Sequence, residues 1–114
     1  MASDQFPTTS SATSLTAAAG PRTLETIVVD NMSKDGSADM VEREFPEVRL
    51  IRAERNLGFA GANNLAFDLA RGRFLYCLNP DTVSHDGSID TLVRVLEEDP
   101  RIGYVGPKLL NADG

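Results

Sequence analysis

Apolar side chains recur at helical spacing in three stretches of the chain, and residues typical of helix ends bound each stretch. Asp35 is the expected N-cap of the first helix, because its side chain can accept a hydrogen bond from a free backbone N–H. The second helix opens at residues 56–58 and closes at Gly72, and the third covers residues 87–98 and stops before Pro100. The three apolar stripes are Ala38, Val41 and Phe45; Phe59, Ala62, Ala66 and Leu69; and Ile89, Leu92, Val93 and Leu96.

Short runs of aliphatic, β-branched and aromatic residues alternate with these helices. They predict strands at residues 24–29, 48–51, 74–78 and 102–105. Strands that alternate with helices at this spacing form βαβ units, in which neighbouring strands run parallel. The pattern therefore predicts an α/β fold with a mainly parallel sheet and flanking helices.

The first part of the chain has a different character. Residues 1–22 are rich in Ser, Thr, Ala and Pro and show no sustained period, apart from a short helical tail at Leu15–Ala19 that Gly20 and Pro21 end. We expect residues 1–22 to form a poorly ordered leader and residues 23–114 to form the folded domain.

The run from Phe74 to Leu78 stands out because it is apolar throughout and stops on Asn79-Pro80-Asp81. A continuous apolar run of this length is typical of a strand buried on both faces. Pro80 has no N–H to donate to a sheet, so the strand must end there. Asn79 and Asp81 would then lie at the carboxyl end of a buried strand, the edge at which open α/β sheets bind ligands.

Polar side chains occupy similar positions elsewhere in the predicted sheet. They are Asp30 and Asn31 after one strand, Asn63 and Asn64 near a helix start, and Asn79 and Asp81 after another strand. If they converge, Asp30 would accept hydrogen bonds from a base or ribose, an asparagine of the helix would donate to the ligand, and Asp81 would hold a divalent cation. Taken singly, each is better explained as a residue that ends a strand or forms a turn.

Composition and charge narrow the possible functions. The net charge of −6 gives no basic face for binding nucleic acid, and no apolar run is long enough to span a membrane. Cys77 cannot form an internal disulfide, because it is the only cysteine, and its apolar neighbours predict a small buried core residue. His85 has only polar loop neighbours and is expected to be solvated.

Four segments together resemble the family 2 glycosyltransferases, and especially the rhamnosyltransferase-like branch that acts on bacterial cell-surface polysaccharides. Their order and spacing both match, over residues 24–114. The segments are Ile27–Ser37 (IVVDNMSKDGS), Asn56–Asn64 (NLGFAGANN), Leu78–Thr82 (LNPDT) and Val105–Leu109 (VGPKL).

This resemblance implies a Rossmann-like GT-A fold that binds a nucleotide-diphosphate sugar, such as a UDP- or dTDP-sugar, and transfers the sugar to a saccharide acceptor. By that similarity, Asp30 contacts the nucleotide, and Asn56 and Gly58 with their helix line the donor pocket. Asn79-Pro80-Asp81 stands where the family has its Asp-x-Asp motif, so Asp81 would hold Mg²⁺ or Mn²⁺ on the diphosphate. The implied reaction is an inverting displacement at the anomeric carbon, assisted by the metal as a Lewis acid.

Two features of the sequence depart from the family pattern. Residues 1–23 contain nothing like the family's first hydrophobic strand, and the acidic general base is expected downstream of the position matching Gly114, so no catalytic residue is assigned in this chain. We therefore expect the donor-binding half of a glycosyltransferase, truncated at both ends. The alternative is a catalytically inactive remnant or nucleotide-binding module. The protein is expected in the cytoplasm, where nucleotide sugars are made. This location includes a peripheral position on the inner face of the membrane.

Overall fold

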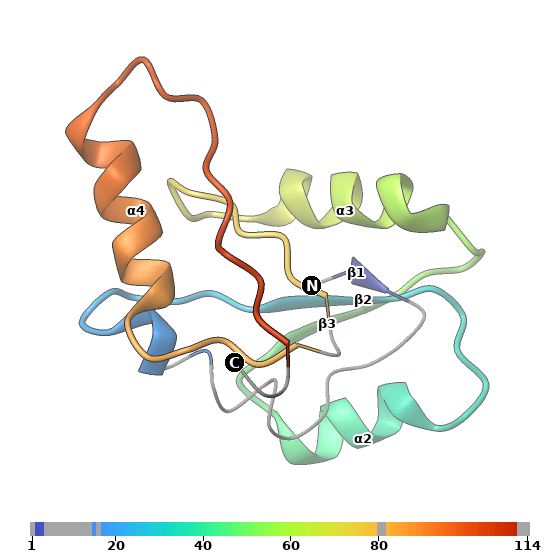
Figure 1. Cartoon of the computed structure of the whole chain (residues 1–114). Coiled ribbons are helices and arrows are strands. Elements are labelled where there is room, and N and C mark those ends of the chain that lie inside the picture. Colours follow the sequence, from blue (N-terminus) through green and yellow to red (C-terminus); the bar gives the residue numbers. More distant parts are fainter. Residues whose placement is uncertain (1, 4–14, 16, 80–81, 112–114) are drawn as a thin grey trace.

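The computed structural model describes residues 2–3, 15, 17–79 and 82–111. Figure 1 shows α3 on one side of a small sheet, α2 on the other side, and α4 beside these layers. The helices and strands are β1 (Ala2–Ser3), β2 (Ile27–Asp30), α2 (Ser37–Glu44), β3 (Arg49–Arg52), α3 (Gly58–Leu69) and α4 (Ser88–Glu98).

The sheet is parallel, with the strand order β1-β2-β3. β2 is central and buried along its whole length, which its β-branched residues favour. β3 pairs with all of β2, from Ile27 opposite Arg49 to Asp30 opposite Arg52, whereas β1 pairs only with Val29 and Asp30. The α/β class with a parallel sheet and flanking helices is confirmed.

The main core lies between β2 and α3. Ile27 and Val29 of the strand pack against Ala62 and Ala66, which are one helical turn apart on α3. Their small side chains let the helix lie close to the sheet. The predicted stripe on this helix is wrong at Phe59, which is 67% exposed, because the first turn of α3 extends past the sheet to the edge of a groove described below.

The strands predicted at residues 74–78 and 102–105 do not form in the described part of the chain, where both segments are extended without sheet pairing. Residues 74–78 alternate between half-buried and exposed positions, so only one face of this segment packs against the protein. Cys77 points to the other face and is exposed, and its predicted burial is therefore wrong. An apolar run specifies that a segment packs, but a sheet also needs a neighbouring backbone in register.

The predicted helices all form, with small shifts at their ends. α2 begins one residue later than expected, since Gly36 and not Asp35 is its N-cap. Asp35 still contributes, because its Oδ1 accepts a hydrogen bond from the Ser37 backbone N–H at 3.0 Å. The hydrogen bond from the Ser37 hydroxyl lowers the pKa of the Asp35 carboxyl most, and the bond from the Ser37 backbone N–H lowers it further.

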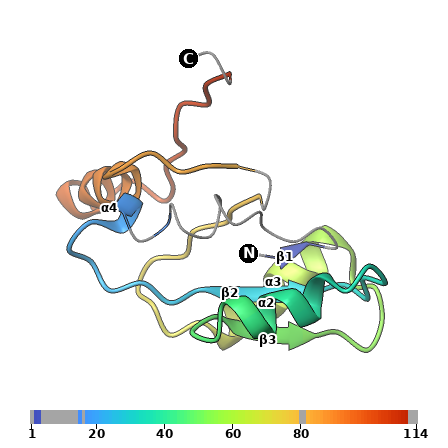
Figure 2. The ribbon, with the colours of Figure 1, turned by 90° about the horizontal axis from the view of Figure 1, so that it is seen from below.

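A second, smaller core joins α4 to the segment that was predicted to be a leader. Leu15 and Ala18 are buried against Ile89, and Tyr76, Leu78 and Val93 pack around them. Residues 17–19 are helical and are followed by a turn at Gly20, as the sequence predicted. Figure 2 shows this helical turn next to α4, away from the sheet. Ala2 and Ser3 of the same segment form β1, whereas residues 1, 4–14 and 16 lie outside the described part, and the domain boundary stays a prediction.

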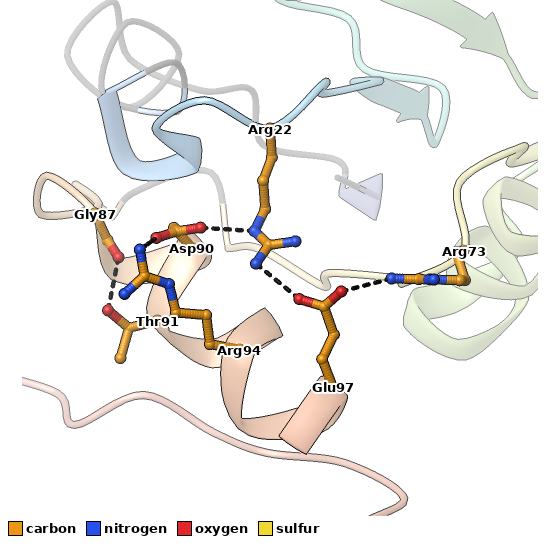
Figure 3. A network of polar contacts seen from close by, with 7 residues as sticks. All are labelled: Arg22, Arg73, Gly87, Asp90, Thr91, Arg94 and Glu97. Carbon is orange, nitrogen blue, oxygen red and sulfur yellow. Dashed lines mark hydrogen bonds and ion pairs between the residues drawn. The ribbon is translucent and has the colours of Figure 1, made fainter. Parts of the chain in front are cut away.

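A network of charged side chains ties α4 to the rest of the protein (Figure 3). Arg22 donates to Asp90 at 2.7 Å and to Glu97 at 2.8 Å. Glu97 also accepts from Arg73 at 2.8 Å, and Asp90 pairs with Arg94 at 2.9 Å on the same helix. Arg22 precedes β2 in the sequence and Arg73 follows α3. Glu97 of α4 therefore links three separate parts of the chain.

The ion pairs of Glu97 make the stability of the fold depend on pH. Hydrogen bonding to Arg22, the largest cause, lowers the pKa of Glu97 below its ordinary value of 4.5. A carboxylate whose pKa is lower in the folded state than in the unfolded state stabilises the fold at pH values above its unfolded-state pKa. This stabilisation is lost as the pH falls through the folded-state pKa. We expect Glu97→Gln to reduce the loss of stability between pH 7 and about pH 3.5, measured by urea denaturation at both values.

The matched control is Glu98→Gln, because Glu98 is the exposed neighbour of Glu97 on the same helix. It should keep the acid sensitivity of the unaltered chain. Equal acid sensitivity in both variants would show that the Glu97 ion pairs add nothing to stability.

Candidate functional site

A groove of about 970 Å³ lies between the segment after Tyr76, the first part of α4 and the end of the described chain. Residues 76–79 and 82–85 form one wall, and residues 106–111 form another. Phe59 and Asn63 of α3 also line it. The lining residues therefore come from separate parts of the chain.

Asp30 is held at the carboxyl end of β2. It is buried, and its Oδ1 accepts a hydrogen bond from the Ser33 backbone N–H at 2.8 Å. This bond closes a tight turn in which Met32 has a φ of +64°, a conformation that non-glycine residues seldom adopt. The Ala53 N–H donates to the Asp30 carbonyl at 2.9 Å and fixes the end of β3 beside it.

Asn31 has a structural role that the sequence did not show. Its side chain is buried; Nδ2 donates to the Gly58 carbonyl at 3.2 Å, and Oδ1 accepts from the Leu57 N–H at 3.0 Å. These two bonds join the end of β2 to the first turn of α3. The predicted placement of the α3 N-terminus at the carboxyl edge of the sheet is therefore confirmed. The ligand contact predicted for Asn31 would have to compete with both bonds.

Asn56 and Gly58 shape the same helix start. The Asn56 Oδ1 accepts a hydrogen bond from the Gly58 N–H at 2.9 Å, which forms a tight turn before α3. Gly58 has a φ of +73°, in the left-handed region that glycine adopts at little cost. Both residues therefore lie next to Asn31 at the carboxyl edge, as a shared site requires.

The two other predicted asparagines of α3 differ. Asn63 is half-buried and lines the groove, whereas Asn64 is exposed and is not among the described residues that line it. Asn79 also lines the groove, so the structure brings Asn63 and Asn79 to one cavity. Asp30 is not among the described lining residues, and its convergence with Asn79 on one ligand stays a prediction.

The proposed metal ligand, Asp81, lies with Pro80 outside the described residues. The residues that flank this pair are described: the Thr82 hydroxyl donates a hydrogen bond to the Asn79 carbonyl at 2.7 Å. Amide and hydroxyl oxygens are ligands that suit Mg²⁺ and Mn²⁺, so the neighbouring residues are of the right chemical type. Within the described ranges, no group of three or more His, Cys, Asp or Glu side chains could hold a metal ion.

The groove has a charge character that the sequence did not reveal. Lys108 is the charged side chain among its described lining residues, which include no Asp or Glu, although the protein as a whole has a net charge of −6. His85 also lines the groove. His85 is exposed, as predicted. A local excess of positive charge in an acidic protein favours an anionic ligand. Lys108 reaches the groove through a long-range return of the chain, which local sequence patterns do not specify.

The sequence also matches known proteins. The profile of the family described as Glycosyl transferase family 2 matches residues 9–110, which is most of the chain. The chain belongs to glycosyl transferase family 2. This family assignment confirms the resemblance seen in the four sequence segments, and the α/β fold described above agrees with it.

Three relatives illustrate the family match. The N-acetylglucosaminyl-diphospho-decaprenol L-rhamnosyltransferase of Mycobacterium tuberculosis is 31% identical over 104 residues, which cover 82% of this chain and 34% of the relative. The succinoglycan biosynthesis protein ExoO of Rhizobium meliloti is 38% identical over 76 residues, 66% of this chain and 21% of the relative. A Haemophilus influenzae glycosyltransferase is 30% identical over 81 residues, 71% of this chain and 27% of the relative.

This family 2 chain thus spans about a third, or less, of the length of these relatives. No solved structure matches it significantly. In the part of the chain that the structure describes, no helix has the length and apolar character needed to cross a membrane.

Proposed function

We propose that this chain is the donor-binding part of a glycosyltransferase and binds a nucleotide-diphosphate sugar through a divalent metal, for transfer to a cell-surface polysaccharide acceptor. The observation that carries the proposal is the groove, where Asn63, Asn79, His85 and Lys108 line a space of about 970 Å³. A space of this size suits a nucleotide-sized ligand, and its positive character suits a diphosphate. The relatives named as a rhamnosyltransferase and a glycosyltransferase support the same reaction class.

In this proposal each residue has a defined task. Asp30, fixed by its turn, accepts hydrogen bonds from the base or ribose, and Asn31, Asn56 and Gly58 hold the first turn of α3 beside it. Asn63 and Asn79, which line the groove, orient polar atoms of the donor. Asp81 holds Mg²⁺ or Mn²⁺, which when bound neutralises the departing diphosphate. UDP- and dTDP-sugars are the donors proposed, and the cytoplasm, where such donors are made, is the proposed location.

A second proposal is a module that binds the donor but does not transfer it. Deprotonating an acceptor hydroxyl needs a general base, and the family resemblance implies that this base is an acidic residue. No carboxylate is among the described residues that line the groove. Under this second proposal, donor binding is retained and turnover is absent.

Calorimetric titration of the chain with UDP and with dTDP, with and without Mn²⁺, tests donor binding. We expect binding that requires the metal, and we expect Asp81→Ala to weaken it by at least about tenfold, or about 1.4 kcal/mol. The matched control is Asp86→Ala, because Asp86 is an exposed carboxylate in the following loop and should leave binding unchanged.

Two results would count against the proposal. Binding that is equally tight without metal would remove the role of Asp81, and absence of binding to either nucleotide would remove the donor site. A transfer assay with radiolabelled donor separates the two proposals, because turnover supports the transferase and donor binding without turnover supports the binding module.

A further inference from the structure

A second cavity, of about 400 Å³, shares residues 76–78 with the groove. It lies between α3, residues 22–26 that lead into β2, and α4. Its walls are mostly apolar and include Leu24, Ala66, Phe67, Phe74, Leu78 and Val93. It lies between the two hydrophobic cores, where neither core fills the space.

A void of this size is not an ordinary packing defect. Protein interiors are packed as densely as organic crystals, and an engineered apolar cavity of about 150 Å³ already binds benzene. A cavity of about 400 Å³ is within the range of small-molecule binding sites, which are roughly 300–1,000 Å³. Its apolar walls favour a ligand with an apolar body.

Two members of the charged network in Figure 3 reach this cavity. Arg22 and Arg73 both line the cavity, and both donate to Glu97. The Arg73 guanidinium also lies 4.7 Å from the centroid of the Phe74 ring, which is part of the wall. It is therefore positioned at the boundary between the apolar interior and solvent.

The charged side chains that line the cavity have a positive excess. They are Arg22, Arg73 and Glu25 among the described lining residues, which leaves one positive charge, and Glu25 is itself paired with Arg71 at 3.4 Å. The Arg73 side chain is 72% exposed, and Glu97 is its one ion-pair partner among the described residues. A guanidinium has several N–H donors in a planar fork, so Arg73 can bind a further anion.

We propose that this cavity binds an amphiphile with an apolar body and a single anionic head group. The body fills the space between α3 and α4, and Arg73 binds the head group at the mouth. The cavity shares Asn63 and residues 76–78 with the groove of the proposed donor site, but Arg22 and Arg73 line the cavity and are not among the described residues that line the groove. The inference does not depend on donor binding.

The test compares three probes that share a ten-carbon chain and differ in head group: decanoate, decanol and decyltrimethylammonium. Each is titrated into the full chain below its micellar concentration, and binding is measured by calorimetry and by the thermal unfolding midpoint. We expect decanoate to bind and to raise the midpoint, decanol to bind at least about tenfold more weakly, and decyltrimethylammonium not to bind. Failure of decanoate to bind, or equal binding of decanol, would overturn the proposal.

Two variants assign the head-group contact. Arg73→Gln should weaken decanoate binding by about tenfold and leave decanol binding unchanged, because only the charged head group loses its partner. Arg94→Gln is the matched control, since Arg94 belongs to the same network but is not among the described lining residues. Unchanged decanoate affinity in Arg73→Gln, or an equal loss in both variants, would contradict the role of Arg73.

An extended apolar peptide is the competing occupant. If an uncharged apolar peptide displaced decanoate and bound as tightly to Arg73→Gln as to the unaltered chain, the cavity would be a peptide site and the proposal would be wrong. If UDP binding failed while decanoate binding succeeded, the proposed donor site alone would be rejected.

Discussion

Asn31→Ala is expected to lower the free energy of unfolding by about 2–3 kcal/mol. The substitution removes both hydrogen bonds that join the end of β2 to α3, to the Leu57 N–H and the Gly58 carbonyl. Leu57 is half-buried, so water does not fully replace the lost partner. Because small domains are stable by only about 5–15 kcal/mol, this loss is a large fraction of the total. Urea denaturation followed by circular dichroism gives the measurement.

Asn64→Ala is the control for this prediction. Asn64 is exposed on α3, and alanine favours helix, so stability should change by no more than about 0.5 kcal/mol. Asn31→Asp should fall between the two, because it keeps an acceptor for Leu57 but loses the donor to Gly58. If Asn31→Ala proved as stable as Asn64→Ala, the link between the sheet and α3 would have no energetic role.

Val29→Ala should have a similar effect, a loss of about 2–3 kcal/mol in the free energy of unfolding. Val29 is fully buried, at 0% exposure, and packs in the cluster between β2 and α3. Removing its two methyl groups leaves a space that the backbone of a central strand cannot close. The measurement is again the unfolding free energy from urea denaturation.

The matched control is Val95→Ala on α4, where the valine is 37% exposed. Less apolar surface is lost there, and alanine has the higher helix propensity, so a change of at most about 0.5 kcal/mol is expected. Equal losses at the two positions would mean that the β2–α3 cluster is not the main core.

Much of the fold follows from local sequence patterns. The runs that predicted strands at residues 24–29 and 48–51 correspond to β2 and β3, and the three apolar stripes correspond to α2, α3 and α4. Periodicity and end signals act within a few residues, so they are readable without the structure. The run at residues 74–78 was misread because its apolar character is shared by buried strands and by extended segments that pack on one face.

The candidate site was predictable in part for the same reason. The placement of Asp30 and Asn31 after a strand, and of Asn56 and Gly58 before a helix, is local, and the structure confirms that these groups meet at one edge of the sheet. The groove walls from residues 106–111 and the positive charge of Lys108 come from a distant return of the chain. No pattern near Asn79 could have indicated them.

The sequence by itself determined the alternation of strands and helices, the parallel sheet and the membership of glycosyl transferase family 2, because each depends on residues close together or on motifs in fixed order. Only the tertiary structure decided that Asn31 bonds a helix start 26 residues away, that Arg22 and Glu97 pair across 75 residues, and that a cavity separates two small cores. Such contacts are set by how the packed elements bring distant side chains together, and that arrangement depends on the whole chain at once.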